Sequence, residues 1–166
     1  MFVVLRPDIS EKIGKIIGEI ERWAVRVVVF DSENRIAIVH SQKRNFYELP
    51  DGGVEKEETY QEAAIRECKE EIGCDIKIES ELGLIIEYRK LENLKKESYG
   101  YVAHVKGVKG KLNLVDDELD LKIFIKWVSV EEAIKLIKSS KKPLEYIAEL
   151  CAKRDIVFLE ETKNRH

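Results

Sequence analysis

An acidic stretch at residues 49–74 constrains this chain more than any other part of it. It reads LPDGGVEKEETYQEAAIRECKEEIGC, a glycine turn followed by a helical pattern. If the helix begins near Thr59, the carboxylates of Glu67, Glu70 and Glu71 lie within a wedge of roughly 100° on one face. Apolar side chains gather on another face, which can pack against a core: Ala64, Ile65, Cys68 and Ile72.

Three carboxylates on one helix face repel one another and cost helix stability unless a positive charge neutralises them. Mg²⁺ and Mn²⁺ prefer oxygen ligands of this kind. The glycines before the helix suit a phosphate that approaches the helix N-terminus closely. We therefore predict a divalent-metal site that handles a phosphorylated ligand. The simpler alternative is a solvated acidic helix, which is how we interpret Glu55, Glu57 and Glu62.

The spacing of this stretch resembles the Nudix box, G-x5-E-x7-R-E-U-x-E-E-x-G-U, in which U is a bulky apolar residue. Every fixed polar and glycine position is met, by Gly52, Glu58, Arg66, Glu67, Glu70, Glu71 and Gly73. The two U positions hold Cys68 and Cys74, which are smaller than usual but apolar when reduced. The resemblance implies a hydrolase that uses Mg²⁺, or Mn²⁺, to cleave a pyrophosphate bond in a nucleoside diphosphate linked to another group.

The resemblance also implies roles for the box residues. The residues that match the family's metal-binding glutamates are Glu67, Glu70 and Glu71. Glu67 could also help to deprotonate the attacking water, so we assign Glu67, Glu70 and Arg66 to catalysis. Arg66 matches the arginine that orients a glutamate, and Glu58 matches a partner near the metal or between loop and helix. Gly73 is expected to end the helix in a left-handed turn.

Two expected contributions lie at less regular positions. Asp51 stands where family members often have a glycine whose backbone carbonyl reaches a metal. Asp51 keeps that carbonyl, so we count it among the ligands, although its side chain restricts the backbone and adds charge. Family members also use an acidic residue outside the box. Our candidate is Glu118 in the DDELD loop, with Asp117 second, and a solvated acidic turn is the alternative.

The substrate is less well constrained by the sequence. Candidates for binding its phosphates are Lys43, Arg44 and Arg26. Candidates for stacking on a base are Phe46, Tyr47, Tyr88 and Tyr99, although such aromatic residues more often belong to a core. The motifs associated with hydrolases of ADP-ribose, NADH and coenzyme A are absent. A nucleoside triphosphate, or an oxidised one, is therefore the first expectation, and a dinucleoside polyphosphate or nucleotide sugar the second. The alternative of another class is a non-catalytic Nudix-fold module that binds nucleotides.

Strand patterns surround the acidic helix. We expect strands at 23–30, 35–40, 46–49, 75–79, 82–89, 99–107 and 121–128, and a charged loop at 91–98. Ser129, with Glu132 three residues on, is a capping box that opens a helix to about Ser139, and a final helix follows Pro143. This order favours an α/β (α+β) sandwich around a mixed sheet, and the resemblance implies the same Nudix-like α/β/α sandwich.

The 166 residues suffice for one domain, which we assign to 23–166. Residues 1–22 are expected to form an N-terminal extension, a short strand at 2–5 and an amphipathic helix that packs on the domain. The apolar stripe of that helix could instead pair two subunits, so a homodimer is the alternative.

Composition excludes several classes of protein. The hydrophobic fraction is 44% and the net charge −3, which is unlike a disordered chain and gives no strong nucleic-acid signal. The three cysteines form no C-x-x-C pair, which argues against zinc and disulfides and favours a reducing compartment, the cytoplasm. We expect no signal peptide and no membrane span.

Overall fold

Strand β2 (Ile20–Phe30) lies at the centre of the sheet and joins its two halves. The computed structural model describes residues 2–5, 20–43, 45–89, 93–110, 123–140 and 145–165. On one side, β2 pairs in parallel with β7 (Leu94–Val105), which continues antiparallel to β6 (Ile76–Arg89) and then to β1 (Phe2–Leu5). On the other side it pairs antiparallel with β3 (Ile36–Ser41) and β5 (Asp51–Gly53). Strands β4 (Phe46–Glu48) and β8 (Ile123–Val128) both pair with β3.

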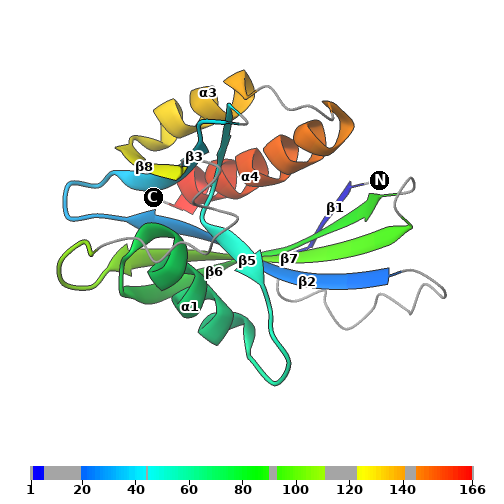
Figure 1. Ribbon diagram of the computed structural model, residues 1–166, viewed down its shortest axis with the longest axis horizontal. Coiled ribbons are helices and arrows are strands. Elements are labelled where there is room, and N and C mark those ends of the chain that lie inside the picture. The colour runs from blue at the N-terminus through cyan, green and yellow to red at the C-terminus, as the bar shows by residue number, and fades with distance from the viewer. Residues whose placement is uncertain are drawn as a thin grey trace.

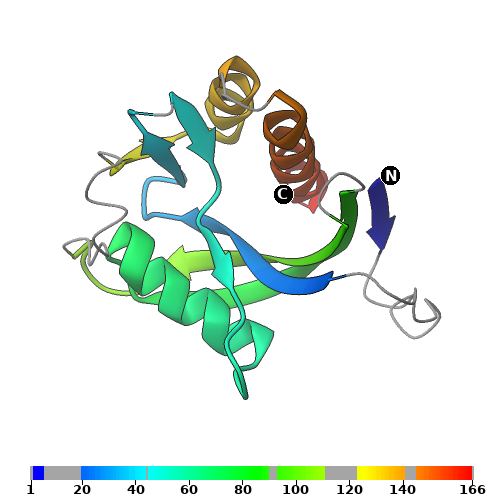
Figure 2. The same cartoon turned by 45° about the vertical axis from the view of Figure 1, so that its right-hand side comes forward.

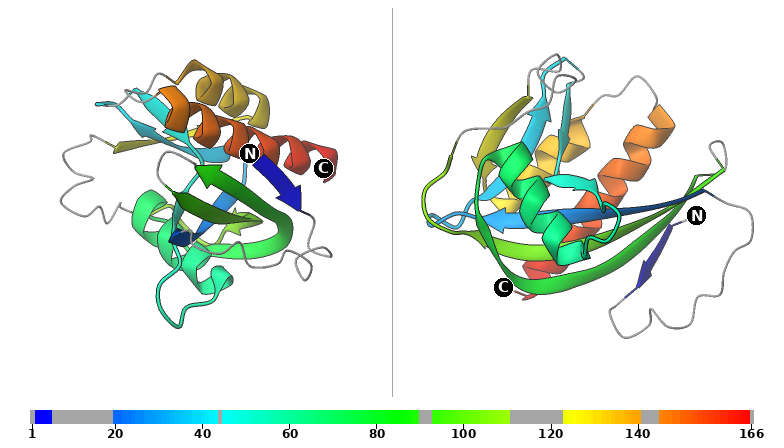
Figure 3. Two further views of the ribbon diagram at one scale, coloured as in Figure 1. Left: turned by 90° about the vertical axis from the view of Figure 1, so that its right-hand side faces the viewer. Right: turned by 60° about the horizontal axis from the view of Figure 1, so that its bottom comes forward.

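Helices cover both faces of this mixed sheet. Helix α1 (Tyr60–Ile72) lies on one face, and helices α3 (Val130–Ser139) and α4 (Glu145–Arg165) lie together on the other (Figures 1 and 2). The two views of Figure 3 show the same three layers from the side and from below. The α/β/α sandwich around a mixed sheet, expected from the sequence, is confirmed.

The apolar run in β2 has a partner on each face. Val25, Val27 and Val29 pack in the core beneath α1, whereas Val28 and Phe30 pack in the core beneath α3 and α4. A strand covered on both sides needs apolar residues at successive positions, since its side chains alternate between the faces.

Two strand predictions were wrong in detail. Residues 94–98, expected in a loop, form the first half of β7, where Lys95 is paired with one carboxylate on its own strand and one on β2. The Lys95 ammonium lies 2.7 Å from the Glu97 carboxylate and 3.4 Å from that of Glu21. The two strands expected at 75–79 and 82–89 are a single strand, β6, whose pairing register shifts in that interval.

Several predictions concern the chain ends and loops. The strand expected at 2–5 is confirmed as β1, which pairs with β6 and so ties the N-terminus to the sheet. The amphipathic helix expected after it, Arg44, and the DDELD loop with Glu118 and Asp117 lie outside the described residues. No helix in the ranges given above has the length and apolar character needed to cross a membrane.

Candidate active site

Helix α1 is fixed at both ends by local contacts that the sequence predicts. Thr59 is its N-cap and accepts a hydrogen bond from the Glu62 N–H, while the Glu62 carboxylate accepts one from the Thr59 N–H. Glu62 therefore belongs to a capping box, which corrects its interpretation as a merely solvated acid. The helix ends at Gly73, whose φ of 66° is left-handed as expected.

The apolar face of α1 packs against the sheet. Ala63, Ala64, Cys68 and Ile72 are buried there. Ile65, which the sequence placed on this face, is 44% exposed and borders a surface pocket beside residues 55–58. Cys68 and Cys74, at the two bulky positions of the box, are buried free thiols.

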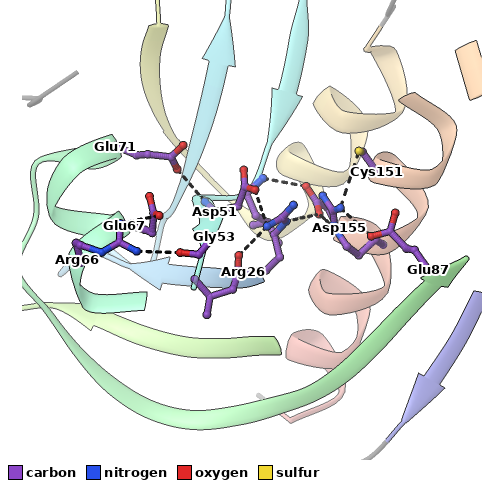
Figure 4. Close-up of polar contacts among 12 residues, drawn as sticks. Arg26, Asp51, Gly53, Arg66, Glu67, Glu71, Glu87, Cys151 and Asp155 are labelled. Carbon is purple, nitrogen blue, oxygen red and sulfur yellow. Dashed lines mark hydrogen bonds and ion pairs between the residues drawn. The ribbon is translucent and has the colours of Figure 1, made fainter. Parts of the chain in front are cut away.

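The guanidinium of Arg66 joins the glycine loop to the acidic face of α1. Its Nε and Nη2 donate to the two carboxylate oxygens of Glu58 at 2.8 and 2.9 Å. Nη2 also donates to the Gly53 carbonyl at 2.8 Å, and Nη1 donates to Glu67 at 2.8 Å and to Glu70 at 3.4 Å. Figure 4 shows Arg66 between the helix and Gly53. Three glutamates predicted for the site thus share the guanidinium of Arg66, namely Glu58, Glu67 and Glu70.

Strand β5 brings the glycine loop against two other carboxylates of the site. The Asp51 N–H donates a 2.8 Å hydrogen bond to Oε2 of Glu71. Figure 4 draws this bond as a dashed line between the two labelled residues. Gly52 lies against the Glu67 carboxyl group so closely that a Cβ on Gly52 would overlap it. Nothing lies near the equivalent position on Gly53. A side chain at Gly52 would therefore displace the Glu67 carboxyl group, and one at Gly53 would not.

Burial and neighbouring charges move the pKa values of these carboxyl groups in opposite directions. Burial raises the pKa of Glu67, although its bond to Arg66 opposes that rise. Burial also raises the pKa of Glu71 well above its usual range, and the negative charges of Asp51 and Glu48 raise it further. The Glu58 pKa is lowered, chiefly by the hydrogen bonds from Arg66. Glu58 is thus held as a charged partner of Arg66, while Glu67 and Glu71 are acids that gain from a nearby cation.

The donor set fits a hard divalent cation. It consists of carboxylate oxygens, and Glu71 is partly buried beside Glu48 and Asp51, whose charges a cation would offset. In the part of the chain that the structure describes, no three acidic, histidine or cysteine side chains already converge on one point. Instead, Arg66 holds Glu67 and Glu70, and the Asp51 N–H holds Glu71.

Sequence reasoning missed two residues near this site, Glu48 and Asp155, and also the ion pair between Arg26 and the Asp51 side chain. Glu48, at the end of β4, is close enough to raise the Glu71 pKa. The Asp51 side chain forms an ion pair with Arg26, which is itself 2% exposed and also lies near Asp155 of α4. A signal for Arg26 existed, because it is the one charged residue within the apolar run of β2. Arg26 was a candidate for binding substrate phosphates, and in the structure it is buried and paired.

Other substrate candidates lie around β4. Lys43 is exposed, and Phe46 is only 2% exposed, so its ring is covered in this structure. Tyr47 is partly buried and stacks on His40, with ring centroids 4.1 Å apart. Among these residues, Lys43 and Tyr47 offer surface to a ligand.

Comparisons with known proteins point to one family. Residues 21–150 match the family model described as NUDIX domain. An RNA pyrophosphohydrolase from Pelagibacter ubique (strain HTCC1062) is 33% identical over 76 residues, which is 44% of this chain and 48% of that protein. The chain thus spans about half the length of this curated relative.

Solved structures share the fold at low identity. The MutT protein from Methanosarcina mazei Go1 superposes with a TM-score of 0.56 at 18% identity, covering 90% of this chain and 98% of that one. An Ap4A hydrolase from C. elegans, solved as a binary complex, gives 0.60 at 18% identity, covering 86% and 96%. Likeness at this level of identity shows the fold.

Proposed function

The chain belongs to the Nudix family, and from this premise we propose that it hydrolyses a pyrophosphate bond in a nucleoside diphosphate linked to another group, using Mg²⁺ or Mn²⁺. One observation carries the proposal. The box arginine, Arg66, binds the Gly53 carbonyl, Glu58 and Glu67 at once, so the glycine loop and the acidic helix form one site.

We assign the binding of the cation to Glu67, Glu70 and Glu71, with Glu58 and the backbone carbonyl of Asp51 as further candidates. A divalent ion supplies charge neutralisation of the pyrophosphate and activation of the attacking water when it is bound. The side chain of Glu70 is 46% exposed, so its carboxylate is open to an incoming ligand. Almost no covalent chemistry is then required of the protein, whose residues position the reacting groups and stabilise charge.

Glu67 is our candidate for accepting the proton of the attacking water. Burial raises its pKa, and a higher pKa makes a carboxylate a better base near neutral pH. Its hydrogen bond with Arg66 fixes the carboxylate next to Gly52, where the backbone leaves room for it. Glu118 remains our candidate for an acidic group from outside the box.

For the substrate we propose a nucleoside triphosphate first, including an oxidised one, with a dinucleoside polyphosphate or nucleotide sugar second. The relationship to an RNA pyrophosphohydrolase favours adding RNA with a 5′-triphosphate to the candidates. Lys43 and Arg44 would bind phosphates, and Tyr47 would contact a base; Phe46 would do so only if its ring became exposed. We also propose a cytoplasmic protein, with a homodimer as one candidate assembly.

The test is a substrate panel assayed for released phosphate and pyrophosphate. The panel contains the common and oxidised nucleoside triphosphates, Ap4A, a nucleotide sugar and a 5′-triphosphorylated RNA, each with Mg²⁺, with Mn²⁺ and with EDTA. Turnover that requires the metal, and that Glu70→Gln abolishes, is the expected result. Glu79→Gln is the matched control, because Glu79 is an exposed glutamate that pairs with His104 and is not among the residues assigned to the site.

A panel without turnover, combined with nucleotide binding that does not need the metal, would favour the non-catalytic module. Unchanged metal binding in both Glu70→Gln and Glu71→Gln would also count against the assignment of these glutamates. Light scattering of the same preparation would show whether the chain forms a dimer.

A further inference from the structure

The glycine loop before α1 is held from behind by the C-terminal helix, α4. Asp155 is a fully buried residue of α4, and its Oδ2 accepts a 3.1 Å hydrogen bond from the Leu49 N–H. Its Oδ1 lies 3.6 Å from Nε of Arg26, and the Arg26 guanidinium pairs with the Asp51 carboxylate. One carboxylate on α4 thus holds two loop residues, Leu49 directly and Asp51 through Arg26.

The front of the same loop faces the candidate metal site. The Asp51 N–H donates to Glu71, and the Gly53 carbonyl accepts from Arg66. Between the two ends, the Pro50 carbonyl accepts a 3.0 Å hydrogen bond from the Val27 N–H. A continuous set of contacts therefore runs from Glu71 through Asp51 and Arg26 to Asp155, as Figure 4 shows from left to right.

Asp155 is itself held in place. Nε of the neighbouring Arg154 donates to its Oδ1 at 2.9 Å, and Nη1 of Arg154 donates to Oε2 of Glu87 at 3.0 Å. Arg154 and Glu87 are both fully buried. Buried charges need partners of this kind, and their geometry is rigid because no water competes for the hydrogen bonds. The rear support of the loop is therefore fixed to both α4 and β6.

We propose that Asp155 is a positioning residue for the metal site, acting through Arg26 and Asp51 to fix the loop amide that orients Glu71. This inference rests on the proposed function in assuming that Glu71 binds a cation. It also accounts for Asp51, whose side chain stands where the family often has glycine. In this chain the Asp51 side chain forms the ion pair that connects Arg26 to the loop.

The proposal separates two buried groups of the same network. Asp155 contacts the loop directly. Glu87 instead accepts hydrogen bonds from Arg154, at 3.0 Å, and from Arg89, at 3.1 Å. Both residues are fully buried and ion-paired, so Asp155→Asn and Glu87→Gln should each lower the stability of the fold. Asp155→Asn acts on the loop directly, whereas Glu87→Gln reaches it only through Arg154, so Asp155→Asn should loosen the loop more. Glu87→Gln is therefore the matched control for a purely structural role.

The first measurement is amide hydrogen exchange of the metal-free proteins. Asp155→Asn should speed exchange at the Leu49 and Asp51 amides relative to the rest of the sheet, and by clearly more than Glu87→Gln does. The second is Mg²⁺ binding by calorimetry, without substrate. Loss of a residue that supports a ligand typically weakens metal affinity by about 10- to 100-fold, and we expect the lower end for Asp155→Asn.

A milder variant guards against a failure to fold. Asp51→Asn removes the partner of Arg26 at a side chain that is 21% exposed, so the fold should survive. Asp51→Asn should weaken Mg²⁺ binding. The double variant, Asp51→Asn with Asp155→Asn, should lose less Mg²⁺-binding free energy than the two single variants lose together, because both residues act through Arg26. Additive losses would overturn the proposal, as would equal losses of Mg²⁺ affinity in Asp155→Asn and Glu87→Gln.

The two proposals fail in different ways. If the wild-type protein binds no Mg²⁺ and hydrolyses nothing, the proposed function is wrong. If wild type binds Mg²⁺ but Asp155→Asn leaves both the affinity and the Asp51 amide exchange unchanged, the positioning role alone is wrong.

Discussion

The guanidinium of Arg66 holds the carboxylate of Glu58 through two hydrogen bonds, Nε to Oε1 at 2.8 Å and Nη2 to Oε2 at 2.9 Å. The same planar group donates to the Gly53 carbonyl and to Glu67. Because the five donors of arginine have a fixed geometry, this one side chain sets the spacing between the loop and the helix. An ammonium group cannot reproduce that arrangement.

Arg66→Lys should therefore impair hydrolysis while retaining the positive charge. We expect kcat/KM to fall by about 10- to 100-fold and the free energy of unfolding to fall by about 1–3 kcal/mol, since hydrogen bonds to charged groups are lost. Steady-state kinetics and urea unfolding would measure the two effects. Arg35→Lys is the control, because Arg35 also binds a carboxylate, that of Asp31, through two nitrogens in the β2–β3 turn. If both variants keep full activity, Arg66 does not position the site.

The two glycines of the loop should respond differently to alanine. A Cβ at Gly52 would overlap the carboxyl group of Glu67, whereas a Cβ at Gly53 would meet no atom within 4 Å. Gly52→Ala should displace Glu67 and lower kcat by about 100-fold or more, in the range seen when one positioned catalytic group is lost. Gly53→Ala should keep most of the activity. Kinetics with near-ultraviolet circular dichroism would test this pair, and equal activity of the two variants would contradict it.

The parts of the site that are local in sequence could be predicted. The helix start at Thr59 and its end at Gly73 follow from capping rules that operate within a few residues. The resemblance to the Nudix box implied that Arg66 pairs with a glutamate, but it did not specify Glu58 and Glu67 as the partners. The buried strand β2 was visible as an apolar run, since both of its faces are covered.

The support behind the loop could not be predicted, because it depends on contacts between distant segments. Asp155 follows Leu49 by 106 residues, and nothing near it in sequence marks it as part of a site. The strand at 94–98 was taken for a loop for the same reason. In the sequence its lysines resemble a solvated loop, because the partner of Lys95 on the neighbouring strand β2, Glu21, is distant in the chain.

In the absence of metal, replacing Glu71 by the neutral Gln should not lower the free energy of unfolding. The pKa of Glu71 is raised in the folded protein, so folding favours its protonated form. That contribution is fully present below the unfolded pKa of about 4.3 and is lost as pH rises through the folded pKa. In EDTA at pH 7, Glu71→Gln should therefore be at least as stable as wild type, because the buried charge is gone.

Mg²⁺ should restore the advantage of wild type over Glu71→Gln. A ligand at 100 times its Kd stabilises the folded state by about 2.7 kcal/mol, and the variant should gain much less. Urea unfolding with EDTA and with Mg²⁺, repeated between pH 5 and pH 8, would measure both effects. The prediction fails if, in EDTA, Glu71→Gln has a much lower free energy of unfolding than wild type.

Lys96 should reduce the stability of the fold at neutral pH. It lies opposite Glu87 in the β6–β7 pairing, and burial, followed by the charges of Arg26 and Arg154, lowers its pKa to about 8. Between pH 8 and the unfolded value near 10.4, the unfolded chain binds the proton more readily than the folded one. The free energy of unfolding should therefore rise with pH in this window, whereas below pH 8 the full cost of the buried charge remains.

Lys96→Met isolates this effect because methionine has a similar length and no charge. At pH 7 the variant should be more stable than wild type by about 3 kcal/mol, which is the scale of a pKa shift of about two and a half units. Its advantage should shrink steadily between pH 8 and pH 10.4 as the wild-type amine loses its proton. Lys77→Met provides the control, since Lys77 is exposed on the same strand pair and should show no such trend. A constant difference between Lys96→Met and wild type across this window would mean that Lys96 titrates normally, and that the cluster around Arg26 and Arg154 is less positive than its geometry indicates.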